Sequence, residues 1–480
     1  MLLVLALVAI LYLLYTTTAI IQCLYYHPLS HIPGPKLWIA FPLLRHISSV
    51  RGRFDIDLRA FHRTYGEAVR FAANEVSFIT AQAWKDIYGH GHLQLPKALH
   101  SQADPLNIFE SNDADHSRYR KALSHAFSAK GLLAQEPVLK DYIDLLITKL
   151  KDAAESESMV DMVKWYNITT FDLIGDLVFG QSSGGLESSE YHIWVTTAFR
   201  FLRVLPFIRM WDVYPLVKHL AGLFMPKSLV ALRVHQLEFL KTSVEKRLAR
   251  PNQRGHADFM DSMLRHRGEK DGLSLKELIS NSSALIFAGS ETSATLLSGV
   301  TFLLKNPATW RKLSDEVRSV MQCEGDITFS NATANLPYML GCIEEALRRY
   351  PPVPSGFQRI TTSPSVISGY QISQNTKVSV HQSAAYYSPL NFHQPERFIP
   401  ERWLPEATTD PQSPFFNDKR DVLQPFSVGP RNCIGRNLAY NEIRLILARV
   451  IWAFDLELSP ESQAWDDQKS YILWDKPPLM

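Results

Sequence analysis

The stretch PFSVGPRNCIGRNLA, from Pro425 to Ala439, holds Cys433, one of four cysteines in 480 residues. Gly429 and Gly435 lie on either side of this cysteine and allow the backbone to approach a flat ligand closely. A helical pattern begins near Asn437, and the N-terminus of a helix stabilises the negative charge of a thiolate. An isolated cysteine is by default a buried core residue, but these neighbours favour a thiolate that binds a ligand.

Arginines that suit the acidic groups of such a ligand occur in this loop and elsewhere in the chain. A guanidinium group binds a carboxylate through two parallel hydrogen bonds. The candidates are Arg431, Arg359 and Arg120. A lone thiolate ligand, access for a flat molecule and arginines that bind carboxylates together fit haem.

Composition limits what the rest of the chain does. The sequence is 46% hydrophobic and has no Gly/Ser linker, internal repeat or low-complexity block, so we expect one large domain with an extensive core. The formal net charge of +2 gives no reason to expect a nucleic-acid partner. The remaining cysteines form no CxxC pair, which favours a reducing compartment and argues against a zinc site.

The N-terminal segment predicts a transmembrane anchor. Residues 1–26 carry no charged side chain, and twenty residues of helix span about 30 Å, the hydrocarbon thickness of a bilayer. A cleaved signal peptide is the alternative, but its apolar region would be shorter and would follow a basic segment. Residues 27–36 form a proline-rich hinge that ends the helix, and the basic residues after it favour a cytosolic catalytic domain over residues 37–480.

Hydrophobic periodicity predicts a mostly α fold with a small β part. Helical spacing of apolar positions occurs over residues 115–129, 132–153, 229–249, 274–304, 307–323, 338–349 and 437–453. Short strands are predicted over residues 67–80, 366–372 and 376–380. The segment 274–304 alone would be about 45 Å long as a helix, enough to cross a domain.

This long predicted helix contains the sequence AGSET, Ala288 to Thr292. Ala288 and Thr292 are four residues apart and share one face, and Gly289 omits a side chain where the helix could loosen or admit a small ligand. Taken alone, Thr292 is more often a core threonine that bonds to the preceding turn.

A second motif lies in EEALRRYPPVP, where Glu345 and Arg348 are three residues apart on one helical face and can pair. By itself such a pair on a surface is worth little. Two P-E-R triplets follow, and either Arg397 or Arg402 completes a Glu-Arg-Arg cluster.

With these motifs in place, the sequence resembles the cytochrome P450 family of haem-thiolate monooxygenases from the N-terminal anchor onward. The family's F-x-x-G-x-R-x-C-x-G loop is filled by Phe426, Gly429, Arg431, Cys433 and Gly435. Its E-x-x-R motif is filled by Glu345 and Arg348, and its oxygen-activating helix motif by Ala288, Gly289, Glu291 and Thr292.

The resemblance implies a role for each matched residue. Cys433 is expected to be the axial ligand of haem b, with Thr292 as a hydrogen-bond partner of oxygen and Glu291 as a proton relay. The positions that hold the haem propionates are occupied by Arg431, Arg359 and Arg120. His116 stands where many relatives have tryptophan, and Arg402 is expected to complete the Glu-Arg-Arg cluster because FIPERW occupies the family position.

The chain is similar to fungal microsomal members of the family that act in secondary metabolism. This similarity implies an enzyme of the endoplasmic reticulum membrane that inserts one oxygen atom from O2 into a lipophilic small molecule. The pocket wall is expected to include Phe287, Ala288, Phe357, Ile108 and Tyr471. A haem-thiolate isomerase or dehydratase and a non-catalytic haem-binding protein are the alternatives, and neither would need the proton relay at Glu291 and Thr292.

No flavin, nicotinamide or iron–sulfur motif occurs in the sequence, so we expect electrons to come from NADPH through a separate flavoprotein reductase. Basic side chains around Cys433 are expected to attract this partner. The predicted docking residues are Arg436, Lys419, Arg420, Arg118 and Lys121.

Overall fold

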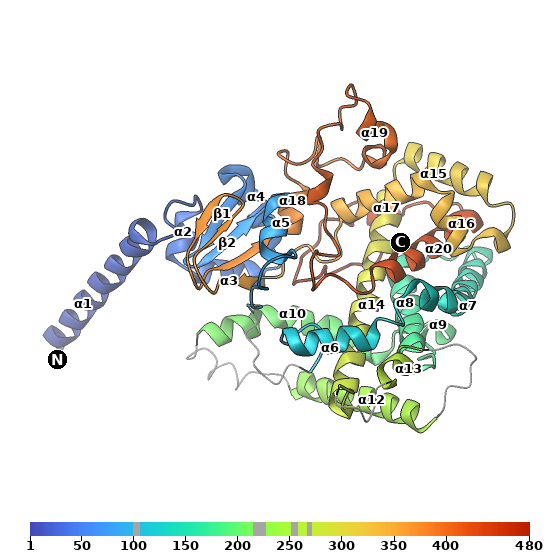
Figure 1. Cartoon of the computed structure of the whole chain (residues 1–480), viewed down its shortest axis with the longest axis horizontal. Helices are drawn as coiled ribbons and strands as arrows, with labels where there is room; N and C mark the ends of the chain where they lie inside the picture. Colours follow the sequence, from blue (N-terminus) through green and yellow to red (C-terminus); the bar gives the residue numbers. More distant parts are fainter. Residues whose placement is uncertain (99–105, 215–226, 251–257, 266–270) are drawn as a thin grey trace. The chain divides into compact units, whose positions relative to one another are not determined.

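The computed structural model describes residues 1–98, 106–214, 227–250, 258–265 and 271–480 (Figure 1). Two compact units emerge from the contacts within the chain. The first, which we name the sheet unit, contains residues 1–99, 354–395 and 418–432. The second, the helical unit, contains residues 100–353, 396–417 and 433–480.

The N-terminal helix α1 (Leu2–Ile21) continues as the π-helical turn η1 (Gln22–Tyr26). No residue of α1 is buried, and residues 2–26 form a helix long and apolar enough to cross a membrane. The helix ends at His27, which adopts an extended conformation ahead of the prolines. This end agrees with the predicted limit of the anchor at residue 26.

The sheet unit is built on a four-stranded sheet in the order β1-β2-β6-β3. Strand β2 (Glu75–Phe78) pairs antiparallel with β1 (Ala68–Ala72) and parallel with β6 (Lys377–Val380), which also pairs antiparallel with β3 (Arg359–Ile360). The predicted strand 67–80 is therefore two strands, because the chain turns at residues 73–74.

The predicted strand 366–372 is likewise a hairpin of β4 (Ser365–Ile367) and β5 (Tyr370–Ile372). Ser368 and Gly369 both have positive φ, at 50° and 83°, which is the backbone of a tight two-residue turn. The helices of this unit are α2 (Lys36–Ala40), α3 (Leu43–Val50), α4 (Phe54–Tyr65), α5 (Ala81–Tyr88), α18 (Gln382–Tyr386) and the 3₁₀ turn η4 (Arg420–Val422).

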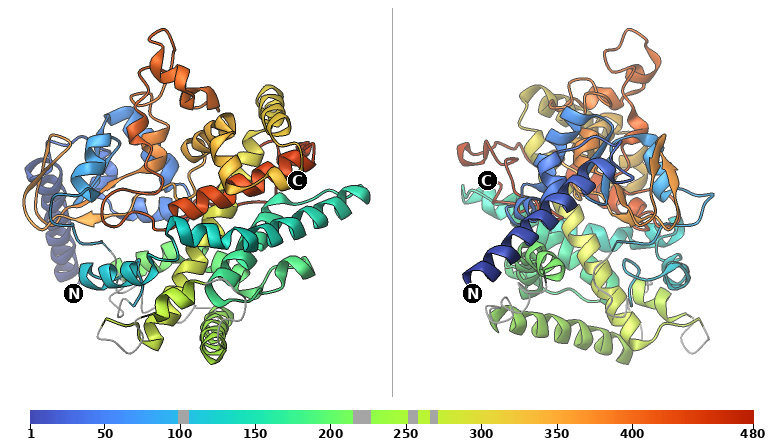
Figure 2. Two further views of the ribbon diagram at one scale, coloured as in Figure 1. Left: turned by 45° about the vertical axis from the view of Figure 1, so that its right-hand side comes forward. Right: turned by 90° about the vertical axis from the view of Figure 1, so that its left-hand side faces the viewer.

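In the helical unit, α14 (Leu275–Leu303) packs along α8 (Met162–Phe179) and also contacts α17 (Pro337–Arg349) and α20 (Arg436–Ala453) (Figures 1 and 2). A capping box begins α14: Ser274 accepts a hydrogen bond from the Glu277 backbone, and Glu277 accepts one from the Ser274 N–H at 2.7 Å. The predicted span 274–304 is thereby confirmed.

The helical unit contains further helices and 3₁₀ turns besides these four. They are α6 (Asp113–Leu123), α7 (Ala129–Glu155), α9 (Gly185–Ser188), α10 (Ile193–Val213), α12 (Lys227–Ala249), α13 (Phe259–Leu264), α15 (Pro307–Val320), η2 (Glu324–Asp326), α16 (Phe329–Ala334), η3 (Pro400–Trp403), α19 (Pro405–Thr409) and η5 (Pro460–Ser462). The predicted mostly α fold with a small β part is confirmed. The helix predicted over residues 115–129 ends earlier, at Leu123, and α8 and α10 were not predicted.

Candidate active site

Cys433 lies three residues before Arg436, the first residue of α20, in the helical unit. The Cys433 residue is exposed to solvent. The protein atoms packed around its sulfur still desolvate the thiol in part, which raises its pKa. The backbone N–H of Gly435 and the charges of Arg120 and Arg436 oppose this rise in pKa because they favour the thiolate. The sulfur is thus accessible and surrounded by groups that stabilise its negative charge.

The residues just before this cysteine, from Phe426 to Arg431, belong to the sheet unit. Gly429 has a φ of 76°, and a Cβ at this position would lie 1.8 Å from the carbonyl oxygen of Tyr88. Only glycine fits there. In the same unit, the buried guanidinium of Arg359 lies over the Tyr88 ring, 5.5 Å from its centroid.

Helix α6 carries two of the predicted haem contacts, His116 and Arg120, one turn apart. Asn112 caps the helix by accepting a hydrogen bond from the Asp115 N–H at 2.9 Å. Burial lowers the pKa of Arg120, and the nearby Cys433 opposes this shift. The charge of Arg120 thus affects the pKa of Cys433, and that of Cys433 affects the pKa of Arg120. Helix α6 therefore places a positive charge near the thiol.

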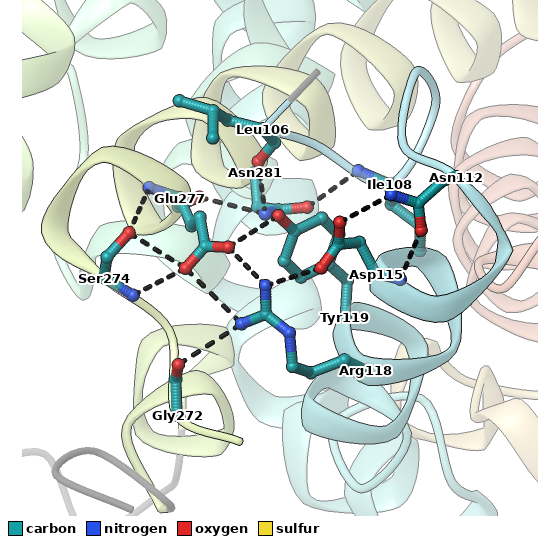
Figure 3. Close-up of polar contacts among 10 residues, drawn as sticks. All are labelled: Leu106, Ile108, Asn112, Asp115, Arg118, Tyr119, Gly272, Ser274, Glu277 and Asn281. Carbon is teal, nitrogen blue, oxygen red and sulfur yellow. Dashed lines mark hydrogen bonds and ion pairs between the residues drawn. The ribbon is translucent and has the colours of Figure 1, made fainter. Parts of the chain in front are cut away.

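A polar network fixes α6 against the start of α14 (Figure 3). Arg118 pairs with Glu277 and donates to Asp115 at 2.9 Å and to the Gly272 carbonyl at 3.2 Å. Although burial alone would raise the pKa of Glu277, hydrogen bonds from Arg118, Ser274 and other groups lower it to about 2. The guanidinium of Arg118 is committed to this network, so Arg118 is not among the docking residues that we propose below.

The same network holds the loop that carries Ile108 (Figure 3). The fully buried Asn281 of α14 donates to the Leu106 carbonyl at 3.1 Å and accepts from the Ile108 N–H at 2.9 Å. Sequence reasoning missed Asn281, although a buried polar side chain on a core helix usually has a specific hydrogen-bond partner. Ile108, predicted to line the pocket, is buried and tied to α14.

Most residues of helix α14 are buried, and the partly accessible ones include the motif at its centre. Phe287, Ala288, Gly289 and Thr292 are half-buried. The Thr292 hydroxyl donates to the Ala288 carbonyl at 2.6 Å, so it does adopt the back-bonded arrangement weighed from the sequence. A Cβ on Gly289 would lie 2.7 Å from Ile174 of α8, which gives a packing reason for glycine at this position.

Glu291 makes contacts that sequence reasoning missed. Its Oε1 lies 2.9 Å from Nζ of Lys476 and accepts a hydrogen bond from the Thr295 hydroxyl at 3.2 Å. Burial raises the pKa of Glu291, and Lys476 opposes that rise. Since Lys476 is far away in the sequence and has no motif around it, nothing in the pattern of residues linked it to Glu291.

The Glu345 cluster, which we define as Glu345, Arg348 and Arg402, is wholly buried in the helical unit. Glu345 accepts from Arg348 at 2.7 and 2.9 Å and from Nε of Arg402 at 3.2 Å. The Ile399 N–H and the Trp403 indole also donate to it, each at 2.9 Å. Arg397 contributes its carbonyl oxygen to Arg348, at 2.9 Å.

A family model described as "Cytochrome P450" matches residues 32–480 of the chain. The chain belongs to the cytochrome P450 family. It is 54% identical over 464 residues to a trichothecene C-4 hydroxylase of Trichoderma arundinaceum, covering 96% of this chain and 93% of that protein. It is 55% identical over 470 residues to the cytochrome P450 monooxygenase olcB of Penicillium canescens, covering 98% and 96%.

An averantin hydroxylase of Dothistroma septosporum is 41% identical over 483 residues, covering 97% of this chain and 89% of that protein. This P450 is accordingly a monooxygenase that uses haem, O2, a small-molecule substrate and a redox partner. Its residues fit the haem group on three counts: an exposed cysteine, a backbone N–H that donates to its sulfur, and a half-buried stretch of α14 at residues 287–289.

The remaining predicted pocket residues are divided between the units. Tyr471, half-buried, precedes Ile472, whose φ of 87° is unusual for a β-branched residue. Phe357, in the sheet unit, is 52% exposed. The pocket contacts of Phe287, Ala288, Ile108, Tyr471 and Phe357 stay a prediction.

Proposed function

We propose that this P450 is a membrane-anchored enzyme that hydroxylates or epoxidises a lipophilic small molecule of fungal secondary metabolism. The observation that carries the proposal is Cys433, an accessible thiol with the Gly435 N–H on its sulfur and Arg120 close by, within the loop that defines the family. Two of the relatives are named as hydroxylases, which favours oxygen insertion over isomerisation or dehydration.

Cys433 would ligate the iron of haem b, and the haem would supply the activation of O2. Arg120 would bind a haem propionate, and His116 lies one turn before it on the same helix. Arg431 and Arg359 are assigned to the propionates, and Phe426, Gly429 and Gly435 to the loop around the haem, from the family motif alone. Ala288 and Gly289 would form the part of α14 beside the haem.

The proton needed for oxygen insertion would pass through α14. The Thr292 hydroxyl would turn from the Ala288 carbonyl and donate a hydrogen bond toward the reacting oxygen. Glu291, one residue earlier, would hold the proton on its carboxylate before delivery, a role that requires an ionisable group. Removal of such a relay typically costs about 10²–10⁴-fold in rate.

Electrons would come from NADPH through a flavoprotein reductase. The basic residues proposed to attract it are Arg436 and Lys121 in the helical unit, both exposed, and Lys419 and Arg420 in the sheet unit. Such basic residues steer an acidic partner, and their effect weakens as salt is added. Neutralising three of these residues should slow reductase-driven turnover at low salt and leave peroxide-driven turnover unchanged; an equal fall in both would contradict the proposed role.

We further propose the domain limits 1–26 for the anchor, 27–36 for the hinge and 37–480 for the catalytic domain, on the cytosolic side of the endoplasmic reticulum. The helix over residues 2–26 and the family match beginning at residue 32 support this division. Removal of residues 1–26 should release much of the enzyme from microsomes with its haem spectrum intact. A truncated protein that fails to fold would show that this segment is part of the core.

The test of the central proposal is the carbon monoxide difference spectrum of Cys433→Ala. The reduced wild-type protein should show the red-shifted band of a thiolate-ligated haem, and the variant should lose it. Cys323→Ala is the matched control because Cys323 is an exposed cysteine outside the site. A thiolate-type band that survives in Cys433→Ala would overturn the assignment. The substrate itself is best sought by comparing the metabolites of a deletion strain with those of its parent.

A further inference from the structure

The contacts of Lys476 single it out among the lysines of the helical unit. All three donors of its ammonium group have acceptors: Glu291 Oε1 at 2.9 Å, Thr295 Oγ1 at 2.8 Å and Asn167 Oδ1 at 3.4 Å. Its side chain is 2% exposed and that of Glu291 is 5% exposed. A buried lysine with complete hydrogen bonding is costly to desolvate, so its position calls for a specific reason.

Glu291 is bound unevenly by these groups. Lys476 and Thr295 both act on Oε1, and no hydrogen bond from the described residues reaches Oε2. Neighbouring residues of a helix point in different directions, so the Glu291 side chain leaves α14 on another side than that of Thr292. The contact with Lys476 therefore fixes one oxygen of the carboxylate and leaves the other available.

We propose that Lys476 is a positioning residue for the proton relay: it pins Oε1 of Glu291 and leaves Oε2 as the oxygen that takes up and releases the relayed proton. This inference rests on the proposed function, which makes Glu291 the relay group. The proton transfer itself is simple: the Oε2–H bond breaks, the proton moves to the acceptor, and the carboxylate remains paired with the ammonium group of Lys476.

The charges around the pair agree with this role. Burial raises the pKa of Glu291 and lowers the pKa of Lys476, and each group opposes the shift of the other. Asp161, at the start of α8, also stabilises the charge of Lys476, and Tyr191 lies close enough to interact with Glu291. A carboxyl group whose pKa is drawn toward the working pH both accepts and gives up a proton readily.

A purely structural role for Lys476 is less well supported, because other contacts already hold the segment that carries it. The Leu479 N–H donates to Asp161 at 3.0 Å, and its carbonyl accepts from the Met162 N–H at 2.8 Å. The Trp465 indole donates to the Pro477 carbonyl at 2.8 Å. None of these three hydrogen bonds involves Lys476, so the segment has attachments that do not depend on the ion pair.

The test compares full-length wild type, Lys476→Met and Lys476→Arg by infrared difference spectroscopy as the pH is varied. Without Lys476, only the Thr295 hydroxyl opposes the effect of burial on the pKa of Glu291, so Lys476→Met should show a protonated-carboxyl band at neutral pH. The band should be absent from the double variant Lys476→Met/Glu291→Gln, which identifies its source. Lys476→Arg should behave as wild type because it keeps the positive charge.

Kinetics provide the second readout and need no substrate, since NADPH consumption and hydrogen peroxide release are measured with a microsomal reductase alone. In Lys476→Met, proton-dependent turnover should fall about 10-fold, less than the 10²–10⁴-fold expected for loss of a relay group, and the solvent isotope effect should rise. Lys305→Met is the matched control, because Lys305 is exposed and donates to the Gln463 carbonyl at 3.1 Å.

The possible outcomes distinguish a failure of this inference from a failure of the proposed function. If wild type lacks the thiolate band with carbon monoxide, the proposed function fails, but the infrared band still reports on the ion pair. If Lys476→Met folds poorly, the double variant with Glu291→Gln should regain stability, because it leaves no unpaired buried charge. An unchanged infrared spectrum and isotope effect in Lys476→Met would overturn the proposal.

Discussion

Two buried groups of charges in the helical unit differ in how completely they are satisfied. Glu345 receives hydrogen bonds on both oxygens from two arginines, an indole and a backbone N–H. Glu291 receives two, both on Oε1. A carboxylate with a full set of donors has one stable state, whereas one with an unbonded oxygen can change its protonation.

The difference separates a structural site from a chemical one. Around the Glu345 cluster, the ions fix the segment 397–403 against α17. The central segment of α14, which we define as residues 288–295, instead carries several groups that are half-buried or shifted in pKa. We expect changes in the Glu345 cluster to affect folding and changes in the α14 segment to affect chemistry.

The largest effect is expected for Glu345→Gln and Arg402→Ala. Glu345→Gln removes the carboxylate charge that pairs with two buried arginines, and Arg402→Ala removes one of those two arginines from Glu345. Breaking a buried ion pair in this way typically costs about 3–5 kcal/mol of folding free energy. We expect little folded, haem-containing protein from either variant, measured as thiolate band per unit of total protein. Arg397→Ala is the control: it keeps the carbonyl oxygen that Arg348 uses and should retain the band. An equal loss in Arg397→Ala would mean that the arginines share the role.

Sequence reasoning found the Glu345 cluster because its parts follow rules of spacing and motif. Glu345 and Arg348 are three residues apart on a helix, and FIPERW identified Arg402. Lys476 had no comparable signal, since its contact with Glu291 depends on how the chain folds after α20. Ion pairs between distant segments are properties of the tertiary structure, so a single sequence does not reveal them.

The helices also differ in whether their sequence patterns reveal them. Helix α14 could be predicted because Ser274 and Glu277 form a recognisable cap before a long apolar pattern. Helix α8 could not, because nearly all of its residues are buried, including Asp172 and Thr170. A helix surrounded by others has no polar face, and its sequence therefore lacks the periodicity on which prediction depends.

The second prediction tests whether packing rather than hydrogen bonding holds the α14 segment. In Gly289→Ala the new Cβ would lie 2.7 Å from Cγ1 and Cδ1 of Ile174, so either this side chain turns or α8 and α14 separate slightly. We expect a loss of about 1–3 kcal/mol in denaturant unfolding. Gly175→Ala on α8 is the control, because nothing lies within 4 Å of its Cβ, and it should be neutral or stabilising. Similar losses in both variants would point to helix propensity instead of packing.

The third prediction concerns the pH dependence that Glu442 of α20 confers. Burial raises the pKa of this carboxyl group from 4.5 to about 8, and the hydrogen bond from Ser293 of α14 opposes the rise. Between these values the folded protein binds a proton that the unfolded chain has released, so stability falls as the pH rises from 4.5 toward 8. The contribution is about 1 kcal/mol per pH unit within that window.

Replacing Glu442 with glutamine should therefore flatten the pH dependence of unfolding. The stability of Glu442→Gln relative to wild type should increase as the pH rises, measured by denaturant midpoints at several pH values. Ser293→Ala should make the pH dependence steeper than in wild type, because it removes the hydrogen bond that lowers the pKa of Glu442. Parallel curves for wild type and Glu442→Gln would show that the carboxyl group is already ionised in the folded protein.

The smallest effect on stability, and the clearest on chemistry, is expected for Thr292→Ala. The variant loses one hydroxyl that bonds back to Ala288, so folding free energy should change by no more than about 0.5 kcal/mol and the thiolate band should persist. Hydrogen peroxide released per NADPH should rise, because oxygen loses its hydrogen-bond donor. Thr301→Ala is the matched control: Thr301 is half-buried on the same helix and contacts the Tyr166 hydroxyl at 2.9 Å, away from the motif. If both variants released the same amount of peroxide as wild type, Thr292 would be a core threonine, and the division between a structural and a chemical site would rest on Glu291 alone.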